Sequence, residues 1–318
     1  MFFDDKKFFE CISKKLRTKY LSNEFQEIFK GNSYWRLTSA NFVGQQVNNY
    51  LVNNNLFSNF EGESPVFFTK STTNVFIEYS LFDTISTSNS GSCFYLDPVH
   101  TCEQKSICCT NCCSNIKAHY CYVTIEPTQN SYNSAELISI FNCHRQSTKP
   151  DILHHTNGNI DIKYINCSYN SVYETSFAFI YQGVGISNIS YSNCLDNKYS
   201  VDGAANIATD SKNKNLNFVN NLCPNYFLIY GPQCNILFSY CVFYKNIAKS
   251  FSSQPINIEF CSFSKNSFQP KQPSIPFSGT RYIYFDNRCN NQYNYNVCSN
   301  VNCNTRSYMI LFLQLFLN

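Results

Sequence analysis

The densest group of residues able to do chemistry lies between positions 100 and 121. Its cysteines follow the pattern Cys102-x5-Cys108-Cys109-x2-Cys112-Cys113-x7-Cys121. All five histidines lie in or near this region, at His100, His119, His144, His154 and His155. Cys109 and Cys112 have the two-residue gap common in structural zinc sites. Either Cys121 or His119 would help to complete a set of four ligands.

The same cysteines also fit a role without metal. A zinc ribbon would present a second, separated pair at matching spacing, whereas adjacent cysteines point to opposite faces of a strand. We therefore favour thiols of the wall, or local disulfides, in an irregular coil. We predict no cofactor and no metal ligand. The candidates for a rival zinc site are Cys109, Cys112, His119 and Cys121.

Catalytic carboxylates are the second chemistry to consider. Glycoside hydrolysis needs two of them on one face, roughly 5 to 9.5 Å apart. The acids of the repeat described below fall at different offsets: Asp161, Asp196, Asp202, Asp210 and Glu259. A polysaccharide lyase would need a basic catalytic residue, and the only arginines between residues 74 and 285 are Arg145 and Arg281. We predict no enzymatic activity. A groove that combined acids with Arg145 or His155 would favour a carbohydrate-active enzyme, either a polysaccharide lyase or a hydrolase.

Composition indicates a folded β protein. The 318 residues (36.7 kDa) are 43% apolar, which is enough for a continuous core, and only 14% are charged. The 43 asparagines and the 17% of aromatic residues suit strands and tight turns better than helices. A net charge of +3 is too small for a nucleic-acid-binding surface, so nucleic acid is not an expected partner.

The two ends of the chain differ from the rest. Residues 1–31 are predicted to form a helical cap, because Phe9, Ile12 and Leu16 recur at helical spacing. The chain starts without the apolar stretch of a signal peptide, although its 18 cysteines suggest an oxidising compartment. Residues 301–318 include an apolar run about half as long as the roughly 20 residues that span a bilayer. This segment is expected to be a cap or a truncated anchor that associates with a membrane.

An internal repeat occupies much of residues 32–300. Its clearest copies, NILFSYCVFYKN from Asn235 and PINIEFCSFSKN from Pro255, match without gaps at an offset of 20 residues. Positions 1, 3 and 5 after the anchor residue are mostly apolar, as in a strand, and positions 6 and 8 shift the phase. The shift predicts a kink or bulge between two short strands. Similar segments start at Asn74, Asn115, Asn159, Asn188 and Asn215.

Such a unit cannot bury both faces of its strands alone, so the copies must stack. We predict an all-β solenoid of about nine to eleven coils over residues 32–300, in which each strand pairs with its counterpart in the next coil. The anchor asparagine is interpreted as a turn residue, and stacked asparagine amides are an alternative. Cys241 and Cys261 share one offset and are expected to stack as reduced thiols. Cys167 and Cys223 share another offset.

Aromatic residues recur at position 5 of the repeat, and they have two interpretations. On an outer wall they would stack against sugar rings or a partner's surface, and inside they would fill the core. We predict core or wall packing. The residues concerned are Tyr79, Tyr120, Tyr164, Tyr240 and Phe260.

The coil N-I-x-[IF]-x-[YF]-C-x-F-x-x-N, with unequal loops, resembles right-handed parallel β-helix proteins of the pectate-lyase-like superfamily. More narrowly, it resembles the asparagine- and cysteine-rich β-helix surface proteins of trichomonad parasites, over about residues 55–290. The resemblance implies a right-handed parallel β-helix, a location at the cell surface or outside the cell, and an adhesin-like role. Its partner would be an extracellular protein or glycan.

These patterns together predict a non-enzymatic scaffold for surface display. Loops vary in such folds while coils carry stability, so the contact residues are expected in two uneven insertions. The insertions are 98–115 and 142–158.

Overall fold

The computed structural model describes residues 35–37 and 48–268, apart from 54, 129, 144–150, 176, 202 and 233. Thirty strands and no helix occur in these residues. No helix of the described part is long and apolar enough to cross a membrane. The predicted helical cap (1–31) and the apolar C-terminal segment (301–318) lie outside the described residues.

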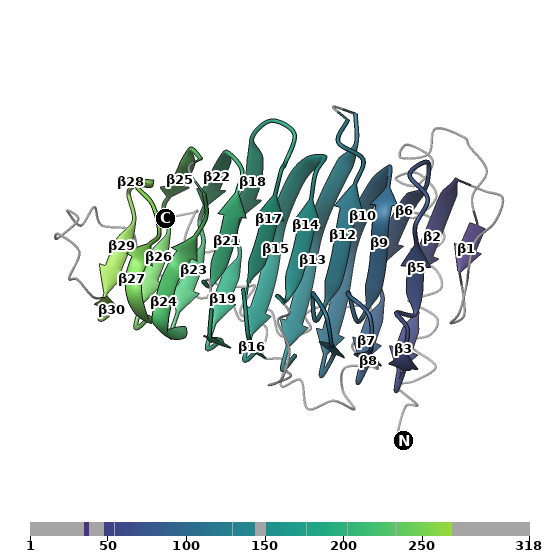
Figure 1. Cartoon of the computed structure of the whole chain (residues 1–318), viewed down its shortest axis with the longest axis horizontal. Helices are drawn as coiled ribbons and strands as arrows, with labels where there is room; N and C mark the ends of the chain where they lie inside the picture. Colours follow the sequence, from purple (N-terminus) through teal and green to yellow (C-terminus); the bar gives the residue numbers. More distant parts are fainter. Residues whose placement is uncertain are drawn as a thin grey trace, which may run out of the picture.

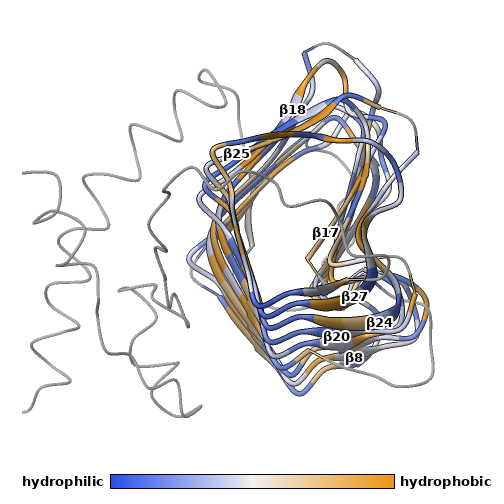
Figure 2. Ribbon diagram, turned by 90° about the vertical axis from the view of Figure 1, so that its left-hand side faces the viewer, coloured by the Kyte–Doolittle hydropathy of each residue, from blue (hydrophilic) through white to orange (hydrophobic). Residues whose placement is uncertain are grey.

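The strands stack into a parallel β-solenoid, as predicted (Figure 1). Every strand pair is parallel, and each strand bonds to its counterpart in the neighbouring coil. Seen along the axis in Figure 2, the coils lie over one another around one interior. The predicted boundaries at residues 32 and 300, and the number of coils, remain predictions because part of that range is not described.

A 16-stranded sheet forms two faces of the solenoid. Its main path runs through β1 (Trp35–Leu37), β2 (Asn49–Asn53), β6 (Asn74–Glu78), β10 (Thr101–Thr110), β13 (Tyr132–Phe141), β15 (Asn159–Ser168), β18 (Ser187–Ser190), β22 (Ser211–Lys214), β25 (Ile236–Ser239) and β28 (Asn257–Glu259). Its second face adds β3 (Leu56–Ser58), β7 (Leu81–Asp83), β19 (Asn193–Leu195), β23 (Asn217–Val219), β26 (Val242–Tyr244) and β29 (Ser262–Ser264).

Two further sheets form the rest of the solenoid wall. A 3-stranded sheet holds β4 (Glu61–Gly62), β8 (Ser86–Thr87) and β11 (Cys113–Ser114). An 11-stranded sheet holds β5 (Val66–Phe68), β9 (Phe94–Val99), β12 (Cys121–Ile125), β14 (Leu153–Thr156), β16 (Ser171–Val172), β17 (Ala178–Tyr181), β20 (Lys198–Tyr199), β21 (Ala205–Ala208), β24 (Leu222–Tyr230), β27 (Ile247–Ser252) and β30 (Ser267–Phe268).

The predicted kink is a corner formed by a single residue with positive φ, and a second corner of the same kind, which was not predicted, follows it. The first corner lies between the two faces of the 16-stranded sheet, and the second follows five residues later, as at Tyr240 (φ 56°) and Lys245 (φ 55°). Non-glycine residues rarely adopt this conformation, but here their N–H groups still bond to the next coil, as Tyr240 N–H does to Glu259 O at 3.0 Å. The first-corner residues are Tyr79, Ser106, Leu137, Tyr164, Tyr191, Asn215, Tyr240 and Phe260. Those of the second corner are Asn59, Thr84, Asn111, Asn142, Tyr169, Asp196, Asn220, Lys245 and Lys265.

Between the two corners, one column of side chains points into the core. Its members stack in register and are all apolar or sulfur-containing, so they exclude water from the interior. Phenylalanine rings stack along it, at centroid distances such as 4.8 Å for Phe57–Phe82 and 4.7 Å for Phe243–Phe263. The column is Phe57, Phe82, Cys109, Ile140, Cys167, Cys194, Phe218, Phe243 and Phe263.

Just after the second corner, asparagines form a ladder inside the solenoid. The Nδ2 of Asn170 donates to Asn197 Oδ1 at 3.0 Å, and the same bond repeats down the axis. The ladder is Asn170, Asn197, Asn221, Asn246 and Asn266. Stacked amides therefore exist, and the long ladder is on the asparagine that closes the repeat. Among the anchors, Asn74 also stacks, donating to Asn49 Oδ1 at 2.8 Å. An anchor such as Asn235 is exposed and bonds to Asp210 instead.

The predicted offsets are correct for some copies and wrong for others. Leu237 pairs with Asn257, so Asn235 and Pro255 share a register at 20 residues. The copies assigned to Asn115 and Asn215 are misplaced: residues 121–125 lie in the 11-stranded sheet, and Asn215 is a corner residue. The copy assigned to Asn188 is shifted by two residues, because Asn188 pairs with Asp161 and not with Asn159. Cys223 also lies in the 11-stranded sheet, so it does not share an offset with Cys167, which pairs with Cys194. Coil length varies from 20 residues here to 31 between Cys102 and Asn133, which hides the register.

Candidate functional site

The outer face of the 16-stranded sheet carries two rows of polar side chains. Because strand residues alternate between faces, each row collects one outward position from successive coils. The first row is Glu103, Ser134, Asp161 and Asn188. The second row, two residues further along each strand, is Lys105, Glu136, Lys163 and Ser190.

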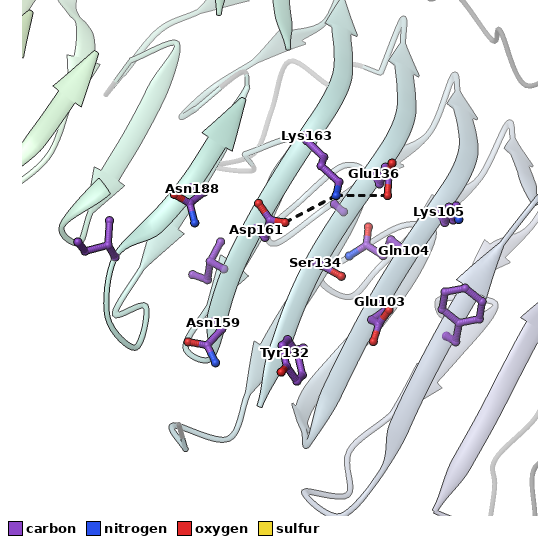
Figure 3. A pocket seen from close by; sticks show the side chains of 14 residues that line it. Glu103, Gln104, Lys105, Tyr132, Ser134, Glu136, Asn159, Asp161, Lys163 and Asn188 are labelled. Atoms are coloured by element: carbon purple, nitrogen blue, oxygen red, sulfur yellow. Dashed lines mark ion pairs between the residues drawn. The ribbon is translucent and has the colours of Figure 1, made fainter. Parts of the chain in front are cut away.

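A shallow groove of about 660 Å³ lies over these rows (Figure 3). It crosses β10, β13 and β15, and Tyr132 and Asn159 line one end of it. The Tyr132 side chain is 56% exposed. The groove therefore offers one open aromatic surface beside amides, hydroxyls and charges, which is a combination suited to a polar ligand.

Lys163 is the centre of the groove's charge network. Its Nζ lies 3.6 Å from Glu136 Oε2 and 3.9 Å from Asp161 Oδ2. Burial raises the pKa of the Glu103 carboxyl, and the charge of Lys105 opposes this shift. Two of the three carboxylates are thus paired with Lys163, and the third is partly desolvated.

Exposed aromatic rings lie along the first corner, one residue beyond the second row. The rings of Tyr164 and Tyr191 stack at 5.3 Å between centroids, and those of Tyr240 and Phe260 stack at 5.1 Å. Between the two pairs, the Lys214 Nζ lies 5.5 Å from the Tyr240 ring centroid. This aromatic ladder borders the wall that holds the groove.

Of the predicted core or wall packing, the core part is wrong for three of the position-5 aromatics, which lie on the outer wall. Tyr164, Tyr240 and Phe260 are 37%, 43% and 52% exposed. The reason is the corner itself: positive φ breaks the strand alternation, so a side chain that alternation would place inside points out. Tyr120 is fully buried, but it is not a corner residue and belongs to a different part of the coil.

Two of the predicted zinc candidates meet in the core. Cys109 and Cys112 join Cys93, and the three Sγ atoms all lie within 4.8 Å of one another. Cys143 adds a fourth sulfur, 3.6 Å from Cys109 Sγ. We call Cys93, Cys109, Cys112 and Cys143 the thiol cluster. The sequence pattern did not single out Cys93 or Cys143, because Cys93 belongs to another wall and Cys143 to the next coil.

The other two candidates lie outside this group. His119 accepts a hydrogen bond at Nδ1 from the Ser114 backbone N–H at 2.9 Å. The Cys121 Sγ lies 3.6 Å from His155 Nε2, in a buried polar cluster with Gln104. Burial, together with the charge of the nearby His154, lowers the pKa of His155 to about 3. His155 is therefore neutral and enclosed, and it does not line the groove.

The acids that line the groove differ from those expected. Of the five acids named from the repeat, Asp161 lines the groove and Asp202 lies outside the described residues. The other acids of the groove, Glu103 and Glu136, were not considered. The long steps on either side of Asn115 left room for one more copy each, but the misplaced copy at Asn115 hid where the strands containing Glu103 and Glu136 begin. Arg145, the proposed basic partner, lies outside the described residues.

The two segments predicted to be contact loops contain strands of the walls. Residues 98–115 are largely strand, comprising the end of β9, β10 and β11, and so belong to the walls. Within 142–158, the described residues include β14, and 144–150 are not described.

No protein-family model matches this chain, and neither a curated protein nor a solved structure is significantly similar to it. The resemblance to β-helix proteins thus rests on the repeat alone. The site has to be interpreted from its own geometry.

Proposed function

We propose that this protein is a non-enzymatic binding scaffold whose outer wall holds an extended glycan. The observation that carries the proposal is the adjacency of the polar groove and the aromatic ladder. Stacked rings give flat apolar surfaces, and the amides and charges beside them supply directional hydrogen bonds. Because the rows repeat with each coil, at roughly 4.8 Å, the wall suits a repetitive chain better than a compact small molecule.

The charges favour binding over catalysis. Lys163 pairs with Glu136 and Asp161, so neither carboxylate stands alone as a general base. A protein partner is the alternative occupant of the same wall. Display outside the cell, a right-handed winding and an adhesin-like role remain part of the proposal, and they rest on the repeat's resemblance to β-helix surface proteins.

Binding of the full chain to a panel of immobilised neutral, acidic and basic polysaccharides tests the proposal. Tyr132→Ala and Tyr164→Ala should each weaken binding about 2- to 10-fold, the loss of one aromatic contact. Tyr181→Ala is the matched control, since Tyr181 is similarly exposed (39%) but lies in the 11-stranded sheet. Equal loss in all three variants, or no binding to any polysaccharide, would reject the groove as a glycan site.

A carbohydrate-active enzyme is the second candidate, favoured by one observation. Glu103 has a raised pKa, as a general acid requires, and Asp161 lies two strands away in the same row. Two strand spacings of roughly 4.8 Å separate the two residues by about 9.6 Å, at the upper limit of the roughly 6.5 to 9.5 Å of inverting glycosidases. Release of reducing ends from a bound polysaccharide, abolished by Glu103→Gln, would replace the scaffold proposal with this one. Antibody labelling of intact cells that express the protein tests display separately.

A further inference from the structure

The thiol cluster collects four sulfur atoms from three parts of the chain. Cys109 and Cys112 lie on either side of the second corner at Asn111. Because that corner turns the chain, both side chains point inward although they are three residues apart. Cys143 lies in the next coil over Cys112, where the corner residues Asn142 and Asn111 are joined by an amide hydrogen bond of 2.7 Å.

Cys93 completes the cluster from the opposite side of the coil, just before β9. Its Sγ lies 3.3 Å from Cys109 Sγ. All four side chains have no exposed surface. The chain thus places four soft donor atoms together in an interior that water does not reach.

The Sγ atoms of Cys93, Cys109 and Cys112 all lie within 4.8 Å of one another, which suits three ligands of a tetrahedral metal site. Cys143 Sγ is close to Cys109 Sγ but not within that distance of all three, so it would have to shift to become the fourth ligand. A zinc ion bound at the usual Zn–S distance of about 2.3 Å holds its sulfurs roughly 3.8 Å apart. The two Sγ–Sγ distances at Cys109 are 3.3 and 3.6 Å. A disulfide would need about 2.05 Å and would use only two of the four thiols.

Zinc binds cysteine as the thiolate, so the ion would supply the positive charge that offsets the cost of ionising buried thiols.

We propose that Cys93, Cys109, Cys112 and Cys143 bind one Zn²⁺ ion inside the solenoid. Each ligand thiol releases its proton to water as the Zn–S bond forms, and no electron is transferred. The ion links the second corners of two successive coils to the wall that precedes β9. This site is independent of the groove, so either proposal stands if the other fails.

Metal analysis of the full chain tests the site, after purification under reducing conditions and dialysis with Zn²⁺. One zinc per chain is expected. Cys93→Ser and Cys143→Ser should lose most of it, whereas Cys167→Ser should keep it. Cys167 is the matched control because it is equally buried in the core column and lies outside the cluster.

Cobalt substitution of the unmodified chain keeps the test decisive if the variants fail to fold. A tetrahedral thiolate site gives Co²⁺ an intense sulfur-to-metal charge-transfer absorption, which added Zn²⁺ should remove. Peptide mapping after alkylation of the denatured protein should find Cys93 and Cys109 as free thiols. A disulfide between them, the absence of the cobalt spectrum, or equal zinc in the cluster and control variants would overturn the proposal.

Discussion

Asn221 Nδ2 donates to Asn246 Oδ1 at 3.0 Å, and this bond continues a ladder through the interior of the solenoid. The same Nδ2 donates to Cys194 O at 2.8 Å, and Asn221 Oδ1 accepts the backbone N–H of Asn197 at 3.2 Å. Each ladder asparagine therefore ties its own coil to both neighbours. Removing one amide leaves buried donors and acceptors in two other coils without this partner.

We predict that Asn221→Ala lowers the free energy of unfolding by about 2 to 3 kcal/mol, because several buried polar groups lose a partner. Asn257→Ala is the control. Because Asn257 is exposed, this substitution should change the free energy of unfolding by no more than about 0.5 kcal/mol. Urea denaturation of both variants measures the difference. Equal stabilities would mean that the ladder does not hold the coils together.

Sulfur at the residue after the first corner should be replaceable by oxygen. Cys241 Sγ accepts the Leu216 N–H at 3.4 Å and donates to Ser239 O at 3.3 Å. Ser192 makes the equivalent bonds with its hydroxyl, to Ile165 N–H and Ser190 O. Cys241→Ser should therefore cost less than Cys241→Ala, which removes the acceptor from a buried N–H and should cost about 1 to 3 kcal/mol. Thermal melting compares the two, and a more stable alanine variant would contradict the hydrogen-bond role.

At the first-corner position of Leu137, asparagine should make the protein more stable than leucine does. Its φ is 57°, a conformation that costs most side chains about 1 to 2 kcal/mol but that asparagine adopts readily. Asn215 already occupies the equivalent corner two coils past Tyr164. Leu137 is also 40% exposed, so little apolar burial is lost. Leu137→Asn should stabilise the protein by up to about 1 kcal/mol in urea unfolding, and a lower stability would show that Leu137 makes an important contact.

Stability should fall on mild acidification because of His155. Its Nδ1–H faces Asn133 Oδ1 and its Nε2 faces the Gln104 amide, so the folded site holds a neutral ring. Burial lowers its pKa from 6.5 to about 3, so between these values the unfolded chain binds a proton that the folded chain does not. The neutral His155 therefore contributes to the free energy of unfolding in full above pH 6.5, and this contribution is lost progressively as the pH falls toward 3.

The His155→Gln variant tests this pH dependence, since glutamine keeps a donor and an acceptor but does not titrate. Between about pH 7.5 and pH 5, the natural chain should lose about 2 kcal/mol more than the variant. Urea unfolding at both pH values gives the comparison. Identical losses would show that His155 ionises freely in the folded protein.

The stacking of the repeats could be predicted from the sequence, but the residue-by-residue pairing between neighbouring coils could not. The closely matched copies at Asn235 and Pro255 revealed stacking, and their phase shift revealed a corner. The direction of Tyr164 could not be read from alternation, because a residue with positive φ interrupts it. Cys93 and Glu103 were missed for a different reason: the coils vary in length, so neighbours in space have no constant separation in sequence.

The five-residue spacing between corners is the same in every described coil that shows both, while the rest of the circuit changes length. An engineer who adds a residue between Tyr240 and Lys245 would turn Phe243 toward solvent and its neighbours toward the interior. Extra residues inserted in the connection that leads from the 11-stranded sheet to the 16-stranded sheet of the next coil would only lengthen that connection. Grafted epitopes or affinity tags therefore belong on that one margin of the molecule.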